Sequence, residues 1–200
     1  MLEIGHFGLG YLLGTACAKL VGTSLNLALL FTVSILPDFD LLFSRFLVHR
    51  GPTHSLFFLL LLSLPFFVIY RKKAFPYFVA LLSHSLIGDI YGSMGVQLFW
   101  PFSRNWIHVF NVSTISDLSF GFELVLFAIS VVVMFVNKDF RKMFSDDMPR
   151  IFWLIPFGVV LGPLLVGGMS PFNSFPILLV VPSLFYLVLF SLLMLGLKFK

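Results

Sequence analysis

Histidine and aspartate residues recur in the first half of this chain, beside or within apolar segments. Imidazole nitrogens and carboxylate oxygens are ligands that zinc, manganese and iron accept in proteins. These residues predict a site for a divalent metal, with zinc as the first expectation and manganese or magnesium as the alternatives. The candidate ligands are His6, Asp38, Asp40, His49, His54, His84 and Asp89.

The sequence HRGPTHS, residues 49–55, holds the densest group of such side chains. A Gly-Pro turn at its centre can fold its two histidines together, and the hydroxyl of Thr53 or Ser55 can cap the helix expected to follow. A helix N-terminus favours an anion, and the guanidinium of Arg50 suits phosphate or carboxylate. The block predicts a combined metal and anion site in which Arg50 contacts the substrate. The alternative is an interfacial loop with a positively charged anchor.

The motif LPDFD places two carboxylates, Asp38 and Asp40, directly after a proline that is expected to end a helix. In an extended segment, side chains two residues apart point the same way. The pair could then face one metal or bridge two, and Asp40 could instead act as a general base. The alternative is a solvated loop with acids that flank a helix, since exposed acids are common.

A second pair, His84 and Asp89, lies in an otherwise apolar segment. Residues five apart do not share one face of a regular helix, so we expect Gly88 to break the helix and let Asp89 turn back. Asp89 is then a metal ligand or a second candidate for the general base. A hydrogen-bonded structural histidine is the alternative for His84.

Near the N-terminus, His6 precedes small residues that recur four apart, namely Gly10, Gly14 and Ala18. Such stripes let membrane helices approach closely. His6 can therefore be a metal ligand or a polar contact that joins two helices. Four further polar residues are weaker candidates for substrate, lipid or proton contacts: Arg104, His108, Asp117 and Glu123.

The composition predicts a multi-span membrane protein. Of the 200 residues, 59% are hydrophobic and 11% are charged, and the mean hydropathy is +1.03, whereas soluble domains carry about 25% charged residues. A charged group at mid-bilayer costs about 3 kcal/mol by insertion scales, so buried acids and histidines need a cavity, a partner or a metal. The net charge of +4 lies in short runs between apolar segments, without the continuous basic face of a nucleic-acid-binding protein.

Seven apolar segments are expected to form an all-α transmembrane bundle, a single integral-membrane domain over residues 1–200. If all seven cross the bilayer, most basic residues, Lys198 and Lys200 included, fall on one side, which the positive-inside rule assigns to the cytoplasm. All five histidines then lie at the opposite face, with the N-terminus outside and the C-terminus in the cytoplasm. The segments are 4–22, 25–36, 55–70, 74–90, 119–136, 151–169 and 176–197.

The motifs above, together with FWPFS at residues 99–103, resemble those of the membrane-bound metal-dependent hydrolases, also described as LexA-binding inner-membrane hydrolases. They cover residues 6–103 in family order, and the His-Arg-Gly-x-Thr-His block is the specific one. The family commonly has three residues between the last His and Asp, where this chain has four. The order His, Pro-Asp, His, His…Asp is also faintly similar to zinc-dependent phospholipase C proteins. The ligands implied are His6, Asp38, His54, His84 and Asp89, with Asp40 and His49 alongside.

The resemblance implies a multi-pass protein of a prokaryotic inner membrane, in which residues 119–200 add further membrane helices. We expect a hydrolase that acts at the outer face on an anionic substrate, for example a phosphoester or a lipid. The metal would activate a water, Asp40 or Asp89 would serve as general base, and Arg50 would hold the anionic group. The expected partners are the lipid bilayer and this substrate.

The alternative function is a transporter or channel for a metal or other ion that uses the same histidines and aspartates. A transport path should place ionisable groups near the midplane and on both faces of the membrane. The expected clustering of these groups on one side favours the hydrolase.

Overall fold

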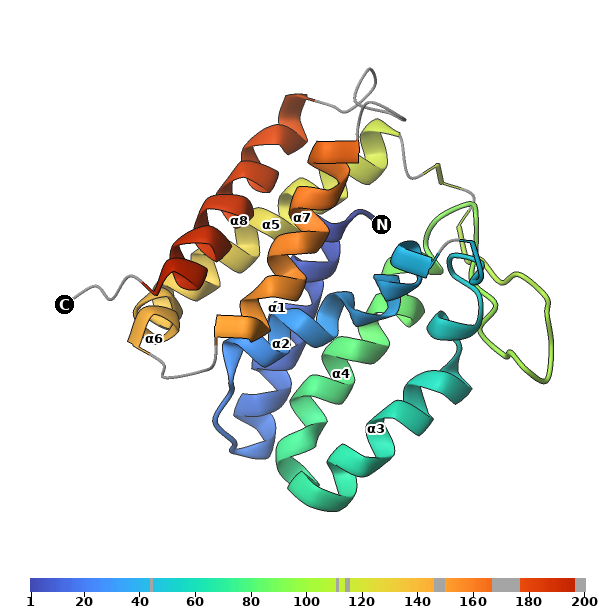
Figure 1. Ribbon diagram of the computed structural model, residues 1–200, viewed down its shortest axis with the longest axis horizontal. Helices are drawn as coiled ribbons and strands as arrows, with labels where there is room; N and C mark the ends of the chain where they lie inside the picture. Colours follow the sequence, from blue (N-terminus) through green and yellow to red (C-terminus); the bar gives the residue numbers. More distant parts are fainter. Residues whose placement is uncertain (44, 111, 114–115, 146–149, 167–176, 197–200) are drawn as a thin grey trace.

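The chain forms an all-helical bundle, shown as a computed structural model in Figure 1. The structure describes every residue except 44, 111, 114–115, 146–149, 167–176 and 197–200, so Lys198 and Lys200 lie outside the described residues. The described part contains no strand beyond two isolated bridges, which confirms the all-α class. The α-helices are α1 (Glu3–Val21), α2 (Leu27–Ile35), α3 (Leu56–Tyr70), α4 (Phe75–Ser83), α5 (Asp117–Val136), α6 (Asp139–Ser145), α7 (Leu154–Val166) and α8 (Ile177–Leu195).

Short turns of tighter or wider helix extend and join these elements. Four are 3₁₀ turns, and the turn that continues α4 is a π-helix, with hydrogen bonds from residue i to i+5. The turns are η1 (Leu36–Phe43), η2 (Pro52–His54), η3 (Arg71–Ala74), η4 (His84–Asp89) and η5 (Arg150–Trp153).

Each of the seven expected apolar segments contains a helix, and the short helix α6 was not expected. The far ends of the expected segments 151–169 and 176–197 lie outside the described residues. Among the described helices, α1 and α5 are long and apolar enough to cross a membrane, judged by length and composition. Helices α2 and α4 have nine residues each, whereas a full span needs about 20. The number of crossings and the orientation therefore stay predictions.

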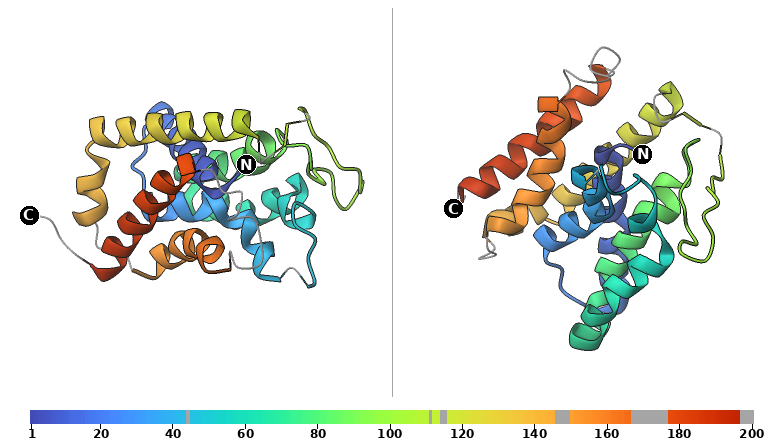
Figure 2. Two further views of the ribbon diagram at one scale, coloured as in Figure 1. Left: turned by 90° about the horizontal axis from the view of Figure 1, so that it is seen from above. Right: turned by 45° about the vertical axis from the view of Figure 1, so that its right-hand side comes forward.

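Helix α1 lies inside the bundle and packs against α2, α4 and α5 (Figure 2). Its glycines make this possible, because a Cβ at Gly14 would lie 2.5 Å from a methyl carbon of Leu30, and a Cβ at Gly10 would collide with the Ser34 side chain. The predicted close approach along the small-residue stripe is confirmed. The close packing of α1 on α2 brings the backbone around Ser34 next to a cluster of polar side chains at one end of the bundle.

Aromatic rings fill the core below that cluster. Phe7 and Tyr11 of α1 pack against Phe31 of α2, and Phe7 and Phe31 pack against Tyr186 and Phe190 of α8, with ring centroids 5.1–6.1 Å apart. All five residues are buried. This packing fixes α1 and α2 relative to each other and thereby the two ends that carry polar residues.

The first turn of α3 is set by Ser55, whose hydroxyl accepts a hydrogen bond from the backbone N–H of Phe58. Of the two caps expected from the sequence, Ser55 is thus the one used. The cap begins α3 directly after His54, which is buried. Turns η1 and η2 contact each other, and η4 contacts α1, so polar residues from distant segments meet at one end of the bundle (Figures 1 and 2).

Candidate metal centre

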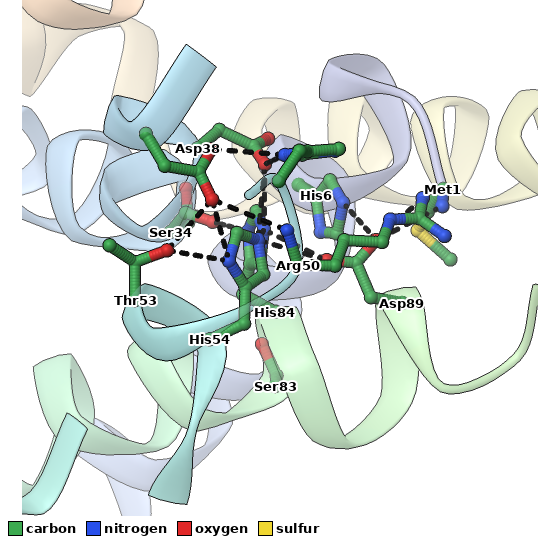
Figure 3. A network of polar contacts seen from close by, with 12 residues as sticks. Met1, His6, Ser34, Asp38, Arg50, Thr53, His54, Ser83, His84 and Asp89 are labelled. Atoms are coloured by element: carbon green, nitrogen blue, oxygen red, sulfur yellow. Dashed lines mark hydrogen bonds and ion pairs between the residues drawn. The ribbon is translucent and has the colours of Figure 1, made fainter. Parts of the chain in front are cut away.

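Four side chains converge on one point between η1, η2 and η4 (Figure 3). They are Asp38 of η1, His54 of η2, and His84 and Asp89 at the two ends of η4. One ligand atom from each lies within 4.8 Å of all the others. Three of the residues are buried, and the side chain of Asp38 retains 11% exposure. The set therefore has one partly open side.

The distances in this set are nearly uniform. The Nε2 atoms of His54 and His84 lie 3.2 Å apart. Each is also 3.3 Å from Oδ1 of Asp38, and they lie 3.3 Å and 3.2 Å from Oδ2 of Asp89. Ligands held about 2.0–2.1 Å from a tetrahedral zinc ion lie about 3.3–3.4 Å from one another. These five distances thus match the spacing that such an ion requires.

The tautomer of His84 is fixed from behind the ring. Its Nδ1–H donates a 2.8 Å hydrogen bond to the backbone carbonyl of Ser34, which can only accept. In the neutral ring, the lone pair is then on Nε2, which faces the centre. A carbonyl behind the ring is a common partner of metal-ligating histidines. The close contact between α1 and α2 at Gly10 places this carbonyl.

His54 is held in the same way by a carboxylate. Its Nδ1 lies 3.3 Å from Oδ2 of Asp40 and 3.0 Å from the hydroxyl of Thr53, which itself donates to Asp40 at 2.8 Å. With the proton on Nδ1, the lone pair of Nε2 points to the centre. Asp40 therefore orients His54 from the far side of the ring, as carboxylates behind zinc-bound histidines do.

The predicted extended geometry of the LPDFD motif is wrong. Asp38 and Asp40 lie in the 3₁₀ turn η1, where residues two apart are separated by about two thirds of a turn. Only Asp38 faces the four-atom set, whereas Asp40 contacts His54 on its opposite edge. The two carboxylates do not point at one place, although both act on the same imidazole.

Asp40 also joins His49 to the cluster. Nδ1 of His49 lies 2.9 Å from Oδ1 of Asp40 and 3.9 Å from Oδ1 of Asp38. Burial raises the pKa of the Asp40 carboxyl, but the hydrogen bonds from His49 and His54 outweigh it and hold the pKa below its usual range. The His49 side chain is 30% exposed. A second metal group could consist of His49, Asp40 and His54. It would have to use Nδ1 of His54, the atom that already contacts Asp40.

Three carboxylates surround His54, and the cluster needs a positive charge among them. Burial lowers the pKa of the His54 imidazole, yet its hydrogen bonds to Asp38, Asp40 and Asp89 raise it more, and the pKa lies well above its usual value. A proton on Nε2 or a metal ion in the same place would supply the charge. The donor set and its electrostatics therefore fit a divalent cation.

The other oxygen of Asp89 is held by cationic groups. Oδ1 lies 3.0 Å from Nη2 of Arg50 and 3.3 Å from the amino group of Met1, which leaves Oδ2 for the four-atom set. Arg50 is 4% exposed and has a left-handed backbone with φ 61°. Its backbone carbonyl accepts from the N–H of Gln97, which helps to hold that conformation. Within the described residues, Nε and Nη1 of Arg50 are buried without a hydrogen-bond partner.

The π-helix η4 explains how His84 and Asp89 meet. The sequence predicted that Gly88 would break the helix, but the chain continues through a wider turn, with the N–H of Ile90 bonded to the carbonyl of Ser85. A π turn takes one more residue than an α turn, so residues five apart come to one face. The four residues between His84 and Asp89 are thus accommodated in one wide turn.

Gly88 has a different role from the one predicted. A Cβ at this position would lie 2.5 Å from Cε1 of His6, so the glycine makes room for that ring. His6 stacks on His84, with centroids 3.6 Å apart and an interplanar angle of 12°. Its Nε2 lies 3.4 Å from Oδ1 of Asp89. His6 thus lies beside the four-atom set and backs its histidine.

Sequence reasoning missed Ser34 and underrated Thr53. Ser34 acts through its backbone carbonyl, for which no side-chain pattern exists, and Thr53 was considered only as a helix cap. Of the weaker candidates, Arg104 and His108 are exposed. Glu123 is buried, and its Oε1 accepts a 2.9 Å hydrogen bond from the N–H of Leu2. It fixes the start of α1 rather than joining the metal group.

Comparison with known proteins agrees with the membrane character of the chain. The model of one family, described as YdjM inner membrane protein, matches residues 1–167. No curated protein and no solved structure matches. The match places the protein at the inner membrane, in contact with the lipid bilayer, and it covers most of the chain. The protein therefore belongs to the YdjM inner membrane protein family.

Proposed function

We propose that this protein is a metal-dependent hydrolase of the inner membrane, with its active site at the outer face of a single multi-pass domain. One observation carries the proposal: four donor atoms, one each from Asp38, His54, His84 and Asp89, converge with five separations of 3.2–3.3 Å, as in a tetrahedral metal site. Both imidazoles are oriented from behind, His84 by a carbonyl and His54 by Asp40. Zinc suits this set best.

When bound, the metal lowers the pKa of a coordinated water and polarises the bond to be cleaved. Hydrolysis of a phosphoester adds a water to phosphorus, breaks the bond to the ester oxygen, and lets the alcohol leave with a proton. The chain must therefore accept a proton from the water, hold the anionic group and return a proton to the leaving oxygen. The residues beside the metal group are suited to these three tasks.

The proton acceptor that the geometry favours is His49. Both oxygens of Asp40 are occupied, Oδ1 by His49 and Oδ2 by Thr53 and His54, and those of Asp89 face Arg50 and the metal group. His49 is partly exposed and hydrogen-bonded through Nδ1 to Asp40, which leaves its Nε2 to accept a proton. Asp40 would hold the ring and stabilise the imidazolium that forms. This arrangement replaces the bases expected from the sequence.

Arg50 is suited to hold the anionic group. One nitrogen of its guanidinium binds Asp89 at 3.0 Å, and its buried Nε and Nη1 lack partners in the described part of the chain. Buried polar atoms without partners are costly, and an anion that accepts from both would satisfy them. A phosphoester next to the metal meets this requirement.

An ion transporter is the alternative, and the location of the cluster favours the hydrolase. Below the metal group, the bundle interior consists of the aromatic core around Phe7, Phe31 and Tyr186, all of which are buried. Ionisable groups of a transport path should continue toward the other face. The metal group instead lies at one end of the bundle, with its open side at Asp38.

Metal content of detergent-purified protein tests the proposal. Wild type should carry near-stoichiometric zinc by inductively coupled plasma mass spectrometry, and Asp38→Ala and His54→Ala should lose it. His108→Ala, which removes an exposed histidine, is the matched control and should keep the metal. Metal-loaded protein should then hydrolyse a soluble phosphodiester. Absence of metal from wild type would overturn the proposal, and metal flux into liposomes without hydrolysis would favour the transporter.

A further inference from the structure

Helix α3 lies at the edge of the bundle, beside α4 (Figure 1). Of its 15 residues, only Leu59 and Ser63 are buried. A cavity of about 640 Å³ lies between α2, α3 and α4. This volume lies in the range of small-molecule binding sites, about 300–1,000 Å³. Its apolar and aromatic lining includes Leu29, Val33, Leu62, Phe66, Tyr77 and Phe78.

The three helices that line this cavity are those that deliver the metal ligands. Leu36 lines the cavity and lies two residues before Asp38, and Leu81 lines it three residues before His84. Helix α3 begins directly after His54. The cavity therefore reaches toward the metal group along α2 and α4, at Leu36 and Leu81. On α3 it is lined from Leu62 to Tyr70, and Lys73 lines it after the end of that helix.

The dimensions and chemistry of the cavity suit a hydrocarbon chain. The lining residues of α3 lie between Leu62 and Tyr70, a stretch of nine residues or about 13 Å at 1.5 Å each. One leaflet of a bilayer, half of a hydrocarbon core of about 30 Å, accommodates a chain of about 15 Å. An acyl chain thus fits along α3. In a bilayer, acyl chains are the surrounding medium, and most of the lining consists of leucine and aromatic side chains. The hydroxyls of Thr32 and Ser63, which also line the cavity, are hydrogen-bonded to backbone carbonyls. The polar residues Ser24, Asn26 and Lys73 lie at the end away from the metal group.

The positive charge near one end of the cavity also favours a phospholipid. A lipid that places its chain between α2, α3 and α4 presents its anionic headgroup at one end of the cavity. At the end near the metal group, Arg50 offers two buried donors without partners among the described residues. A metal ion held by His54 and its neighbours would add positive charge there. The combination of an apolar cavity and a cationic end matches a phospholipid.

We propose that the substrate is a membrane phospholipid, whose acyl chain lies in the cavity between α2, α3 and α4 and whose phosphoester faces the metal group and Arg50. This inference rests on the proposed function, since it names the substrate class of the same site. It adds a binding element, the walls of α2, α3 and α4, that the chemistry of the metal group does not require.

Two substitutions at adjacent positions of α3 distinguish lipid binding in the cavity from lipid contact with the outer surface of the helix. Leu62 lines the cavity, whereas its neighbour Leu61 is 54% exposed and absent from the lining. Leu62→Trp should fill the cavity, and Leu61→Trp adds the same side chain outside it. The probe is a phosphatidylglycerol with a photoactivatable diazirine in one acyl chain, in phosphatidylethanolamine vesicles that contain the purified protein. Crosslinked peptides are mapped by mass spectrometry.

We expect wild type and Leu61→Trp to crosslink at residues that line the cavity, and excess unlabelled phosphatidylglycerol to suppress this labelling. Leu62→Trp should lose most of it while keeping its metal, which shows that the variant is folded. Its KM for a long-chain phospholipid should rise several-fold more than that for a soluble short-chain phosphodiester. Cavity labelling that Leu62→Trp leaves unchanged, or labelling confined to the Lys73 end, would overturn the inference. Loss of the proposed function would appear separately, as absence of metal and of hydrolysis with either substrate.

Discussion

Nε2 of His54 and Nε2 of His84 face each other at 3.2 Å, although each ring has a partner for its Nδ1 proton on the opposite side. Two neutral imidazoles in this orientation direct their lone pairs at the same point. Asp38 and Asp89 add two carboxylate oxygens to that point. Four acceptors without a cation repel one another, and a metal ion turns the repulsion into coordination.

Asp40→Asn should weaken metal binding without abolishing it. Asp40 contacts Nδ1 of His54 and does not belong to the four-atom set. Replacement of a carboxylate behind a metal-bound histidine typically costs about 10–100-fold in metal affinity. Titration of the apo-protein against a zinc chelator measures the change, with Asp117→Asn as a control outside the cluster. A complete loss of metal, as expected for Asp38→Asn, would instead make Asp40 a direct ligand.

Deletion of Ile87 should preserve the metal group. The π turn between His84 and Asp89 holds one residue more than an α turn, and Ile87 is 44% exposed. Its removal gives the spacing of three intervening residues common in the family resembled, and places both ligands four apart on one face of an α-helix. Insertion of one alanine after Ile87 should abolish metal binding. Equal loss of metal in both variants would contradict this account of the turn.

The helices could be predicted from the sequence because hydropathy alone defines apolar segments long enough for helix. The candidate ligands could be predicted for a related reason. His54, His84 and Asp89 are ionisable residues among apolar neighbours, and apolar neighbours do not offset the free-energy cost of removing an ionisable group from water. The local backbone conformation could be predicted less well from the sequence. Pro37 ends a helix in most contexts, and nothing in LPDFD distinguishes the observed 3₁₀ turn from an extended segment.

The orienting contacts could not be predicted because they depend on tertiary packing. Every residue has a carbonyl, and that of Ser34 serves His84 only because Gly10 admits α2 so closely. The sequence predicts both His49 and Asp40 as ligands. Their 2.9 Å contact depends on how η1 packs against the turn that holds His49. The sequence thus identified the ionisable members of the cluster but not which nitrogen or oxygen of each faces its centre.

Gly88→Ala should destabilise the protein and disturb the metal group. The new Cβ would lie 2.5 Å from Cε1 of His6, which is stacked on His84. Overpacking of this kind costs about 1–3 kcal/mol. Thermal unfolding in detergent measures the loss, and the control Gly121→Ala, with nothing within 4 Å of the added carbon, should be neutral or more stable by about 0.5–1 kcal/mol. The double variant with His6→Ala should recover much of the stability, and failure to recover would remove the steric explanation.

His49→Gln should separate metal binding from catalysis. The side chain keeps a hydrogen-bonding amide near Asp40 but cannot accept a proton from water. Metal content should stay at the wild-type level, while kcat for a soluble phosphodiester falls about 10²–10⁴-fold with little change in KM. Loss of metal would make His49 a ligand, and wild-type kcat would exclude it as the base.

Arg50→Lys should impair anion binding more than metal binding. The guanidinium of Arg50 can contact Asp89 through Nη2 and still offer Nε and Nη1 to an anion, whereas an ammonium is a single point charge. Loss of one such charged hydrogen bond, worth about 1.5–3 kcal/mol, weakens binding about ten-fold or more. Isothermal titration of the zinc-loaded protein with inorganic phosphate measures this directly, without any requirement for activity. Arg104→Lys, at an exposed position outside the cluster, should bind phosphate as wild type does. Unchanged phosphate affinity in Arg50→Lys would show that the buried guanidinium serves only to hold Asp89.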